Sequence, residues 1–241
     1  MKIAGIQKLS LLDFPDKLSC LVFTQGCNIR CPFCHNSSII DFNYDNCMDE
    51  KEVFNYLKKR KGILEGVVIS GGEPTLQKDL KDFIIKVREM GYSIKLDTNG
   101  CNPKILKELL DENLLDYVAM DIKNEVETCK YSKTCGLAQM RVDNILESIN
   151  ILKNSKIDYE FRTTITKELH DIDSIRHILA VIGNQPKYFL QNFRLSENVL
   201  DKNMHGFSIE ELKNLEHTLN VDYKNVKVRD LYEEKGEEAY V

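Results

Sequence analysis

Short apolar runs rich in β-branched residues alternate along the chain with segments in which apolar residues recur every three or four positions. The first pattern predicts buried strands, and the second predicts amphipathic helices. Each predicted strand is short enough for a buried parallel sheet. The predicted strands are Ser19–Thr24, Gly66–Ser70, Tyr92–Asp97, Tyr117–Asp121, Tyr159–Thr164 and Tyr188–Phe193. The alternation therefore indicates six βα units.

The segments between these strands each present one apolar face at helical spacing. The positions on these faces are Leu80, Phe83, Ile84 and Val87, then Val142, Ile145, Ile149 and Leu152, then Ile175, Ile178, Leu179 and Ile182. Gly91 and Gly183 stand where a helix C-cap is expected. These signals predict where the first and the last of these three helices end.

The C-terminal part of the chain predicts one more helix and a short strand. Ser208 and Glu211 have the spacing of a capping box. The inward positions of the helix that follows are Leu212, Leu215 and Leu219. A short strand is predicted at Val226–Val228, and the acidic tail from Glu233 is expected to be frayed.

Six βα units of one handedness curl a sheet toward a barrel, whereas a closed eight-stranded barrel usually needs about 250 residues or more. The chain has 241 residues, and 42% of them are hydrophobic, which is enough for one domain with a full core. We therefore predict an α/β fold, a partial (β/α)6 barrel with short N- and C-terminal extensions. Residues 1–241 would form this single domain, with a core at about 18–195 and a C-terminal helix and strand at about 208–230. Ligands are expected beyond the carboxyl ends of the strands.

Composition and charge limit the classes of partner that we expect for this protein. The chain has no run of about 18 apolar residues, and its N-terminus lacks the apolar core of a signal peptide. Acids and bases are interleaved, and the net charge of −5 offers no basic surface for nucleic acid or for a membrane. We therefore expect a cytoplasmic protein that acts on a small molecule or on another protein. Its eight cysteines should then remain thiols.

Three of these cysteines form a motif directly after the first predicted strand. Thiolates of Cys27, Cys31 and Cys34 can each bind one iron of a [4Fe-4S] cubane. The fourth iron then stays open for a substrate or cofactor, as in catalytic metal sites. The alternative is a zinc site completed by His35, although the adjacent Cys34 and His35 would strain to reach one ion. The other five cysteines are scattered, and no auxiliary cluster is expected.

Further polar motifs follow the next three predicted strands. Gly71 and Gly72 let a ligand approach the backbone closely, and Glu73 can accept a hydrogen bond from an ammonium group. The alternative is an ordinary strand-to-helix turn. Asp97 and Asp121 end neighbouring strands and would repel each other unless a cation or an ammonium group lies between them. Each could instead be a helix N-cap.

The pattern Cys-x-x-x-Cys-x-aromatic-Cys, with Phe33 as the aromatic residue, resembles that of the radical S-adenosylmethionine (SAM) superfamily. The resemblance extends over about residues 18–195 and implies a barrel of the radical SAM type. It also implies a cluster whose open iron is chelated by SAM, which an electron from the cluster splits into methionine and a 5′-deoxyadenosyl radical. Residues from Phe33 to His35 would pack along the adenine. Gly71, Gly72 and Glu73 would hold the SAM amino group.

Two further segments resemble those of the glycyl-radical-enzyme activases. The segment Asp97-Thr98-Asn99-Gly100 follows one strand, and Asp121-Ile122-Lys123 follows the next. By this resemblance Asn99, Asp121 and Lys123 belong to the SAM site. A monovalent cation would be held by the side chains of Asp97, Thr98 and Asp121 and by the carbonyl group of Ala119.

The fifth predicted strand adds an arginine, and the sixth departs from the family pattern. Arg162 matches an activase arginine that reaches the SAM carboxylate, a suitable partner for a guanidinium fork. Its alternative role is a surface ion pair. Where the family has a histidine, this chain has Gln191, Phe193 and Arg194, of which we take Gln191 as the SAM contact. Outside the motifs, solvated or satisfied side chains are expected at His170, His177, His205 and His217.

The series of motifs is most similar to that of anaerobic ribonucleoside-triphosphate reductase activating proteins. The resemblance implies an enzyme that docks transiently on a glycyl radical enzyme and abstracts a hydrogen atom from one of its glycines. A flavodoxin or ferredoxin-type protein would supply the electron. The first alternative is a 7-carboxy-7-deazaguanine synthase, which acts on a small pterin, and the next is a peptide-modifying maturase. A zinc-binding module is the alternative outside enzymes.

Overall fold

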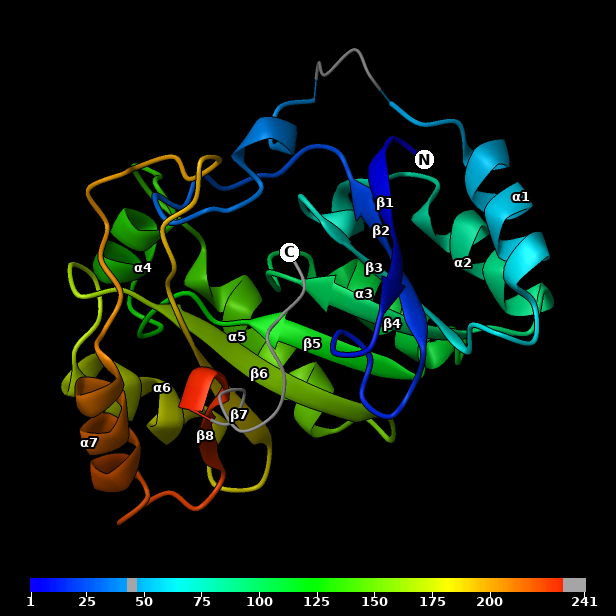
Figure 1. The fold of residues 1–241 in the computed structure, drawn as a ribbon. Helices are drawn as coiled ribbons and strands as arrows, with labels where there is room; N and C mark the ends of the chain where they lie inside the picture. Colours follow the sequence, from blue (N-terminus) through cyan, green and yellow to red (C-terminus); the bar gives the residue numbers. More distant parts are fainter. Residues whose placement is uncertain (43–46, 232–241) are drawn as a thin grey trace.

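A single curved sheet organises the computed structural model, which describes residues 1–42 and 47–231 (Figure 1). Its strand order is β1-β2-β3-β4-β5-β6-β7-β8. The strands are β1 Ile3–Ser10, β2 Ser19–Thr24, β3 Gly66–Gly71, β4 Ser93–Thr98, β5 Tyr117–Asp121, β6 Asp158–Ile165, β7 Lys187–Asn192 and β8 Val226–Val228. Strand β1 runs antiparallel to β2, and every later neighbour is parallel. Sequential order and parallel pairing are the features of an open βα barrel.

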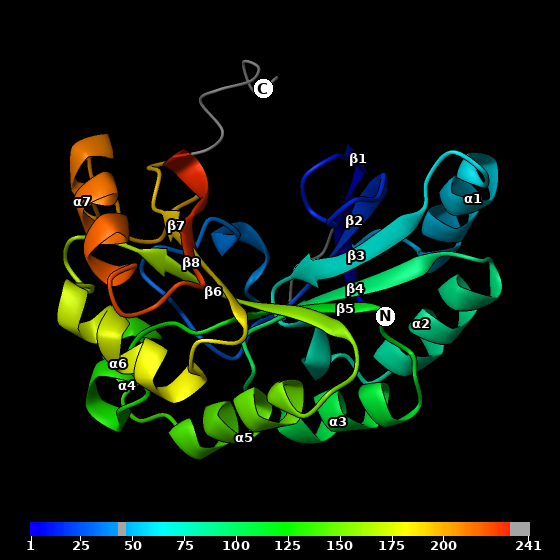
Figure 2. The ribbon, with the colours of Figure 1, turned by 90° about the horizontal axis from the view of Figure 1, so that it is seen from below.

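Helices connect the parallel strands and lie along the outer side of the curved sheet (Figure 2). They are α1 Glu50–Arg60, α2 Leu80–Glu89, α3 Pro103–Asp111, α4 Thr128–Thr134, α5 Val142–Lys153, α6 Ile172–Ile182 and α7 Ile209–Leu219. The described residues also contain short 3-10 helices, which are η1 Ser37–Ile39, η2 Pro74–Leu76 and η3 Arg229–Leu231. None of the helices in the described ranges is long and apolar enough to cross a membrane.

The predicted partial barrel is confirmed, and each predicted strand agrees with an observed one to within one residue at either end. The capping box of Ser208 and Glu211 is present at the start of α7, and Gly183 caps α6 with a φ of 80°. The prediction for the tail from Glu233 lies outside the described residues. That residues 1–241 form one domain stays a prediction.

The N-terminal strand β1 is a strand that the sequence pattern did not predict. Most of its residues are half-buried or exposed, because it pairs with β2 at the edge of the sheet. An edge strand lacks the continuous apolar run by which a buried parallel strand is identified. The predicted N-terminal extension is therefore the first strand of the sheet.

Strand alternation divides the interior into two regions. In β4, Ile94 and Leu96 belong to the apolar layer between the sheet and the helices, whereas Lys95 and Asp97 stand on the other face. That inner face holds a small apolar cluster of Phe14, Leu21, Val68, Tyr117 and Ala119. Toward the carboxyl ends of the strands, the inner face becomes polar. The fold thus positions charged side chains inside the barrel.

The core between α1 and the sheet gives a first test of the packing. Leu57 of α1 is fully buried, whereas Leu12 before β2 is 77% exposed. We expect Leu57→Ala to lower the free energy of unfolding by about 2–5 kcal/mol, because it removes buried methyl groups and leaves a cavity. Leu12→Ala should change it by less than about 0.5 kcal/mol. Urea unfolding of the cluster-free protein, followed by circular dichroism, measures both, and equal losses would contradict this packing.

Candidate active site

One cavity lies at the carboxyl ends of the parallel strands and collects nearly all of the predicted site residues. Its lining comes from the loop after β2 and from the ends of β3 to β7. The predicted residues that line it are Cys27, Cys31, Phe33, Cys34, His35, Gly71, Gly72, Glu73, Asp97, Thr98, Asn99, Asp121, Lys123, Arg162 and Gln191. Ile29, Asn36, Ile40, Ser70 and Thr164 complete the lining.

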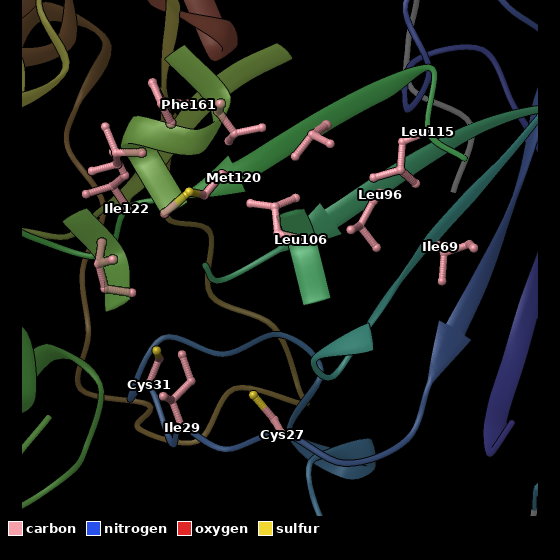
Figure 3. Close-up of a cluster of buried hydrophobic side chains, with 14 of the residues drawn as sticks. Cys27, Ile29, Cys31, Ile69, Leu96, Leu106, Leu115, Met120, Ile122 and Phe161 are labelled. Carbon is pink, nitrogen blue, oxygen red and sulfur yellow. The ribbon is translucent and has the colours of Figure 1, made fainter. Parts of the chain in front are cut away.

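Backbone hydrogen bonds hold the cysteine loop over this cavity. The amide groups of Gly26 and Cys27 donate to the carbonyl groups of Ile39 and Ile40 at 2.8 and 2.9 Å. Farther along, the amide of Arg30 donates to the carbonyl of Cys135 at 2.8 Å. Figure 3 shows Ile29 between Cys27 and Cys31 on this loop. The thiols are thus placed by contacts that involve the main chain.

Burial and a neighbouring thiol shift the pKa values of these cysteines in opposite directions. Burial raises the pKa of Cys27 to about 12 and also raises the pKa of Cys34. A hydrogen bond from the buried Cys135 lowers the pKa of Cys31. Because thiolates are the metal ligands, binding of a metal group here would release protons. The sequence placed Cys135 among the scattered cysteines outside the motif, but its thiol is a hydrogen-bond partner of Cys31.

Glu73 joins two of the motifs instead of standing free in the cavity. It is fully buried, and its Oε1 atom accepts hydrogen bonds from the hydroxyl groups of Thr75 and Thr98 at 2.6 and 2.7 Å. Its Oε2 atom accepts from the amide of Asn99 at 2.7 Å. Burial raises the pKa of Glu73, although these donors favour its ionised form. The carboxylate therefore ties the turn after β3 to the turn after β4.

The two strand-end acids are both bound by cations of the protein. Arg162 donates from Nε to Asp121 at 2.8 Å and lies 3.4 Å from Asp97 through Nη1. Lys123 Nζ lies 2.9 Å from Asp121, and Lys95 Nζ lies 2.6 Å from Asp97. Burial alone would raise the pKa of Asp121, but Arg162 and Lys123 hold it well below its usual range. In the same way, the pKa of Asp97 is lowered by Arg162 and Lys95 against its burial.

Two alternative roles that the sequence left open are wrong. The N-caps of α3 and α4 are Asn102 and Glu127, so neither strand-end acid caps a helix. The side chain of Arg162 is 11% exposed and faces the cavity, so it is not a surface ion-pair partner.

The side chains predicted to hold a monovalent cation have partners within the chain, and the cation site itself stays a prediction. Thr98 directs its hydroxyl to Glu73. The side chain of Ala119 belongs to the apolar cluster on the inner face, whereas the predicted ligand is its carbonyl group. Asp97 and Asp121 each have a cationic partner from the chain. Three of the four predicted ligands are therefore engaged by other side chains.

The side of the cavity toward β7 is aromatic. His35 stacks on Phe193 with ring centroids 5.5 Å apart, and its Nε2 atom lies 2.6 Å from the carbonyl oxygen of Arg194. Phe33 is buried and also lines the cavity. Of the three candidates on the sixth predicted strand, Gln191 lines the cavity, whereas Phe193 supports His35. The ring of His35 therefore has partners other than a metal ion, the carbonyl of Arg194 and the ring of Phe193.

Comparison with known proteins decides the family. The model of the radical SAM superfamily matches residues 21–179. The chain is 35% identical over 198 residues to a protein of Methanocaldococcus jannaschii named "Putative glycyl-radical enzyme activating enzyme", with 79% of each chain covered. This chain belongs to the radical SAM superfamily. As a radical SAM enzyme it uses a [4Fe-4S] cluster and SAM, so the predictions of family, enzyme class and cofactors are confirmed.

Two further proteins are similar over most of this radical SAM chain. The pyruvate formate-lyase-activating enzyme of Clostridium pasteurianum is 27% identical over 248 aligned positions, which cover 100% of this chain and 96% of that protein. A crystal structure of a radical SAM methyltransferase from Sphaerobacter thermophilus shares the fold with a TM-score of 0.70. Its sequence identity is 15%, over 92% of this chain and 68% of that one. Membership of the superfamily makes the zinc-module alternative wrong.

The donor set of the cavity fits both cofactors of the superfamily. Cys27, Cys31 and Cys34 are free thiols that line one cavity, and soft sulfur ligands suit an iron–sulfur cluster. Among the described residues, no three His, Cys, Asp or Glu side chains converge closely enough to hold a single metal ion. Lys123 and Arg162 line the same cavity and carry the charge that a carboxylate ligand requires.

His170 is a supporting residue whose role the sequence did not reveal. It is buried, its Nδ1 atom accepts from the amide of Thr166 at 3.1 Å, and its Nε2 atom lies 2.8 Å from the carbonyl oxygen of Lys123. Its ring meets that of Phe33 edge-on at 6.3 Å. These contacts fix a neutral imidazole that donates to Lys123. No local motif marks the residue, because Lys123 and Phe33 are distant in sequence and only Thr166 is close to it.

The neutral state of His170 predicts a pH dependence of stability. Burial lowers the pKa of His170 below its unfolded value of about 6.5. The folded protein then binds fewer protons than the unfolded chain, so this contribution is present above about pH 6.5 and is lost as the pH falls through the folded pKa. We expect His170→Gln, whose amide can make both hydrogen bonds, to reduce the pH slope of the unfolding free energy between about pH 7 and 5. The exposed His217→Gln should leave the slope unchanged, and an equal effect of both variants would contradict the assignment.

The close approach of two turns predicts the effect of a single methyl group. A Cβ atom at Gly72 would lie 2.1 Å from the carbonyl oxygen of Gly26, which is backbone and cannot rotate away. We expect Gly72→Ala to destabilise the protein by about 1–3 kcal/mol and to lower the iron content after reconstitution. Gly5→Ala is the matched control, because its Cβ atom would meet nothing within 4 Å. Thermal unfolding and iron analysis measure both effects, and a Gly72→Ala protein with full stability and iron content would refute the contact.

Proposed function

We propose that this protein activates a glycyl radical enzyme of the anaerobic ribonucleotide reductase type. The observation that carries the proposal is one cavity in which three thiols share the space with paired cations and carboxylates. The activating enzymes among its relatives, at 35% and 27% identity, support the choice of a glycyl radical enzyme as the target.

In this proposal Cys27, Cys31 and Cys34 hold three irons of the cluster and leave the fourth iron open. When bound, the reduced cluster and SAM supply a 5′-deoxyadenosyl radical. The loop that carries the thiols is held by main-chain hydrogen bonds to Ile39, Ile40 and Cys135. These contacts orient the three sulfur ligands before the cluster binds.

The cations of the cavity would bind and orient the carboxylate of SAM. Arg162 and Lys123 both line the cavity, and both are fixed by Asp121 at 2.8 and 2.9 Å. A guanidinium group held in place loses little side-chain entropy when it binds a carboxylate. Asp121 thus acts as the positioning partner for two cations and contributes negative charge toward the SAM amino group.

The aromatic side of the cavity would receive the adenine. Phe33 and His35 line the cavity, and the stacking of His35 on Phe193 fixes the plane of its ring. Gly71 and Gly72 line the cavity without side chains, so a ligand can approach the backbone there, and Asn99 and Gln191 also line the cavity. The radical chemistry itself needs no general acid or base, so the role of the protein is to orient SAM and to limit competing reactions.

The partners follow from this chemistry. One is the glycyl radical enzyme, which must present a glycine Cα to the open end of the barrel. The other is a flavodoxin or ferredoxin-type donor in the cytoplasm, which delivers one electron to the cluster. The relatives' names concern their own substrates, and the choice of an anaerobic ribonucleotide reductase rests on the order of motifs along this chain.

The rival function is that of a 7-carboxy-7-deazaguanine synthase. It would use the same cavity for SAM and accept a small pterin instead of a polypeptide. The segment of Asp97 to Gly100 and the pair of Asp121 and Lys123 favour the activase. The two functions differ in the molecule that carries the final radical, because only an activase leaves a stable radical on a second protein.

Electron paramagnetic resonance (EPR) of a reconstituted mixture tests the proposal. The protein is incubated without oxygen with SAM, a reductant and a candidate glycyl radical enzyme. We expect a glycyl radical doublet in the partner, and Cys31→Ser should abolish it together with 5′-deoxyadenosine formation. Cys129→Ser is the matched control, because Cys129 is exposed and does not line the cavity.

The outcomes separate the rival readings. Formation of 5′-deoxyadenosine without a doublet in any candidate, together with turnover of the pterin, would overturn the activase in favour of the small-molecule enzyme. Retention of 5′-deoxyadenosine formation in Cys31→Ser would overturn the cluster assignment.

A further inference from the structure

We propose that the ammonium group of Lys95 is a built-in cation of the SAM site and replaces the bound monovalent cation that the sequence resemblance implied. The proposal deepens the proposed function, because it concerns how the chain balances charge beneath the SAM cavity. It rests on a buried lysine that none of the predicted roles used.

Strand alternation forces Lys95 into the barrel. It stands two residues before Asp97 on β4, so both side chains lie on the inner face of the sheet. The residue is only 2% exposed. Its Nζ atom lies 2.6 Å from Oδ1 of Asp97 and 5.9 Å from the ring centroid of Tyr117. A carboxylate and an aromatic face are both favourable partners for an ammonium group.

The charged and polar side chains next to Lys95, other than Asp97, pair with one another. Tyr117 donates its hydroxyl to Oε2 of Glu160 at 2.8 Å, and Arg229 from η3 binds Oε1 of Glu160 at 2.6 Å. Glu160 therefore does not need the charge of Lys95. Its ammonium group is directed to Asp97, on the side of the SAM cavity.

The charges around the cavity show what Lys95 contributes. Within the cluster of ion-paired side chains, Asp97 and Asp121 carry two negative charges, and Lys95, Lys123 and Arg162 carry three positive ones. Glu73 is outside this cluster, because hydroxyl and amide donors hold its carboxylate. One positive charge of the cluster then remains for the carboxylate of SAM. Without Lys95 the balance is zero, and Arg162 becomes the main partner of both acids. A buried carboxylate that loses its partner is strongly unfavourable, so Arg162 would be drawn from SAM toward Asp97.

An external cation has no comparable place in the native protein. The hydroxyl of Thr98 is bound to Glu73, and the carboxylate of Asp121 is bound to Arg162 and Lys123. The first oxygen of Asp97 is taken by Lys95, and its second oxygen is shared by Ser70 at 3.2 Å and Arg162 at 3.4 Å. Removal of the lysine side chain is what would open a place for such an ion.

Two substitutions at Lys95 separate charge from packing. Lys95→Ala removes the charge and leaves space that a potassium, sodium or ammonium ion can enter. Lys95→Met removes the charge but fills the space with an apolar chain. Lys227→Met is the control for loss of a strand lysine, because Lys227 on β8 is exposed.

The experiment measures SAM affinity by calorimetry on the anaerobically reconstituted protein. Choline, sodium, potassium and ammonium chloride are compared at constant ionic strength, choline being too large for the site. We expect the native protein and Lys227→Met to bind SAM with the same Kd, within about twofold, in all four salts. Lys95→Ala should bind at least about tenfold more weakly in choline and recover most of this loss with a small cation. Lys95→Met should be weak in every salt.

A second measurement uses the cluster-free protein and does not depend on SAM. A small cation should raise the thermal unfolding midpoint of Lys95→Ala relative to choline and should leave those of the native protein and Lys95→Met unchanged. Two results would overturn the inference. One is a native protein whose SAM affinity or thermal unfolding midpoint requires sodium or potassium. The other is a Lys95→Ala protein that binds SAM with native affinity in choline. A loss that no cation restores, or equal restoration in Lys95→Met, would also overturn the inference. Failure of the native protein to bind SAM in any salt would instead refute the proposed function, and the midpoints would still decide the role of Lys95.

Discussion

The repulsion between Asp97 and Asp121 is the constraint on which the rest of the site depends. Parallel pairing of β4 and β5 brings both acids to the same edge of the sheet, inside a barrel where water screens charge poorly. The register of β5 with β6 sets Arg162 opposite Asp121, so the guanidinium group reaches both carboxylates. Because each acid also has a lysine two residues away on its own segment, the charge is balanced locally and the strand ends can remain close together.

The buried carboxylate of Glu73 has a structural role at the same edge of the sheet. Glu73 accepts hydrogen bonds from the turn after β3 and from the turn after β4, and the amide that follows Gly72 donates to the carbonyl of Gly26 in the cysteine loop. Three segments that are distant in sequence are thereby fixed to one another. Preorganisation of this kind lets a protein bind a cluster and a charged cofactor without first ordering its loops. The side chain that the sequence suggested as a ligand contact is mainly a connection between motifs.

The chemistry of the superfamily and the selection of a partner lie at different levels of the structure. The thiols, cations and aromatic rings that line the cavity are sufficient to define a radical SAM site. The choice of a polypeptide or a small molecule depends on surfaces around the mouth of the barrel, which carry no short motif. Two of the relatives of this chain bear activating-enzyme names.

The sequence by itself determined the parallel strands, the order of the motifs and the three thiols. Each of these depends on local spacing, because alternation and helical periodicity are properties of neighbouring residues. It could not identify β1, since an edge strand has no continuous apolar run, or His170, whose contact with the carbonyl of Lys123 joins residues distant in sequence. Only the tertiary structure decided which charges meet. Asp97 was expected to face an ion, but the curvature of the sheet and the inner position of Lys95 give it a partner from the chain itself.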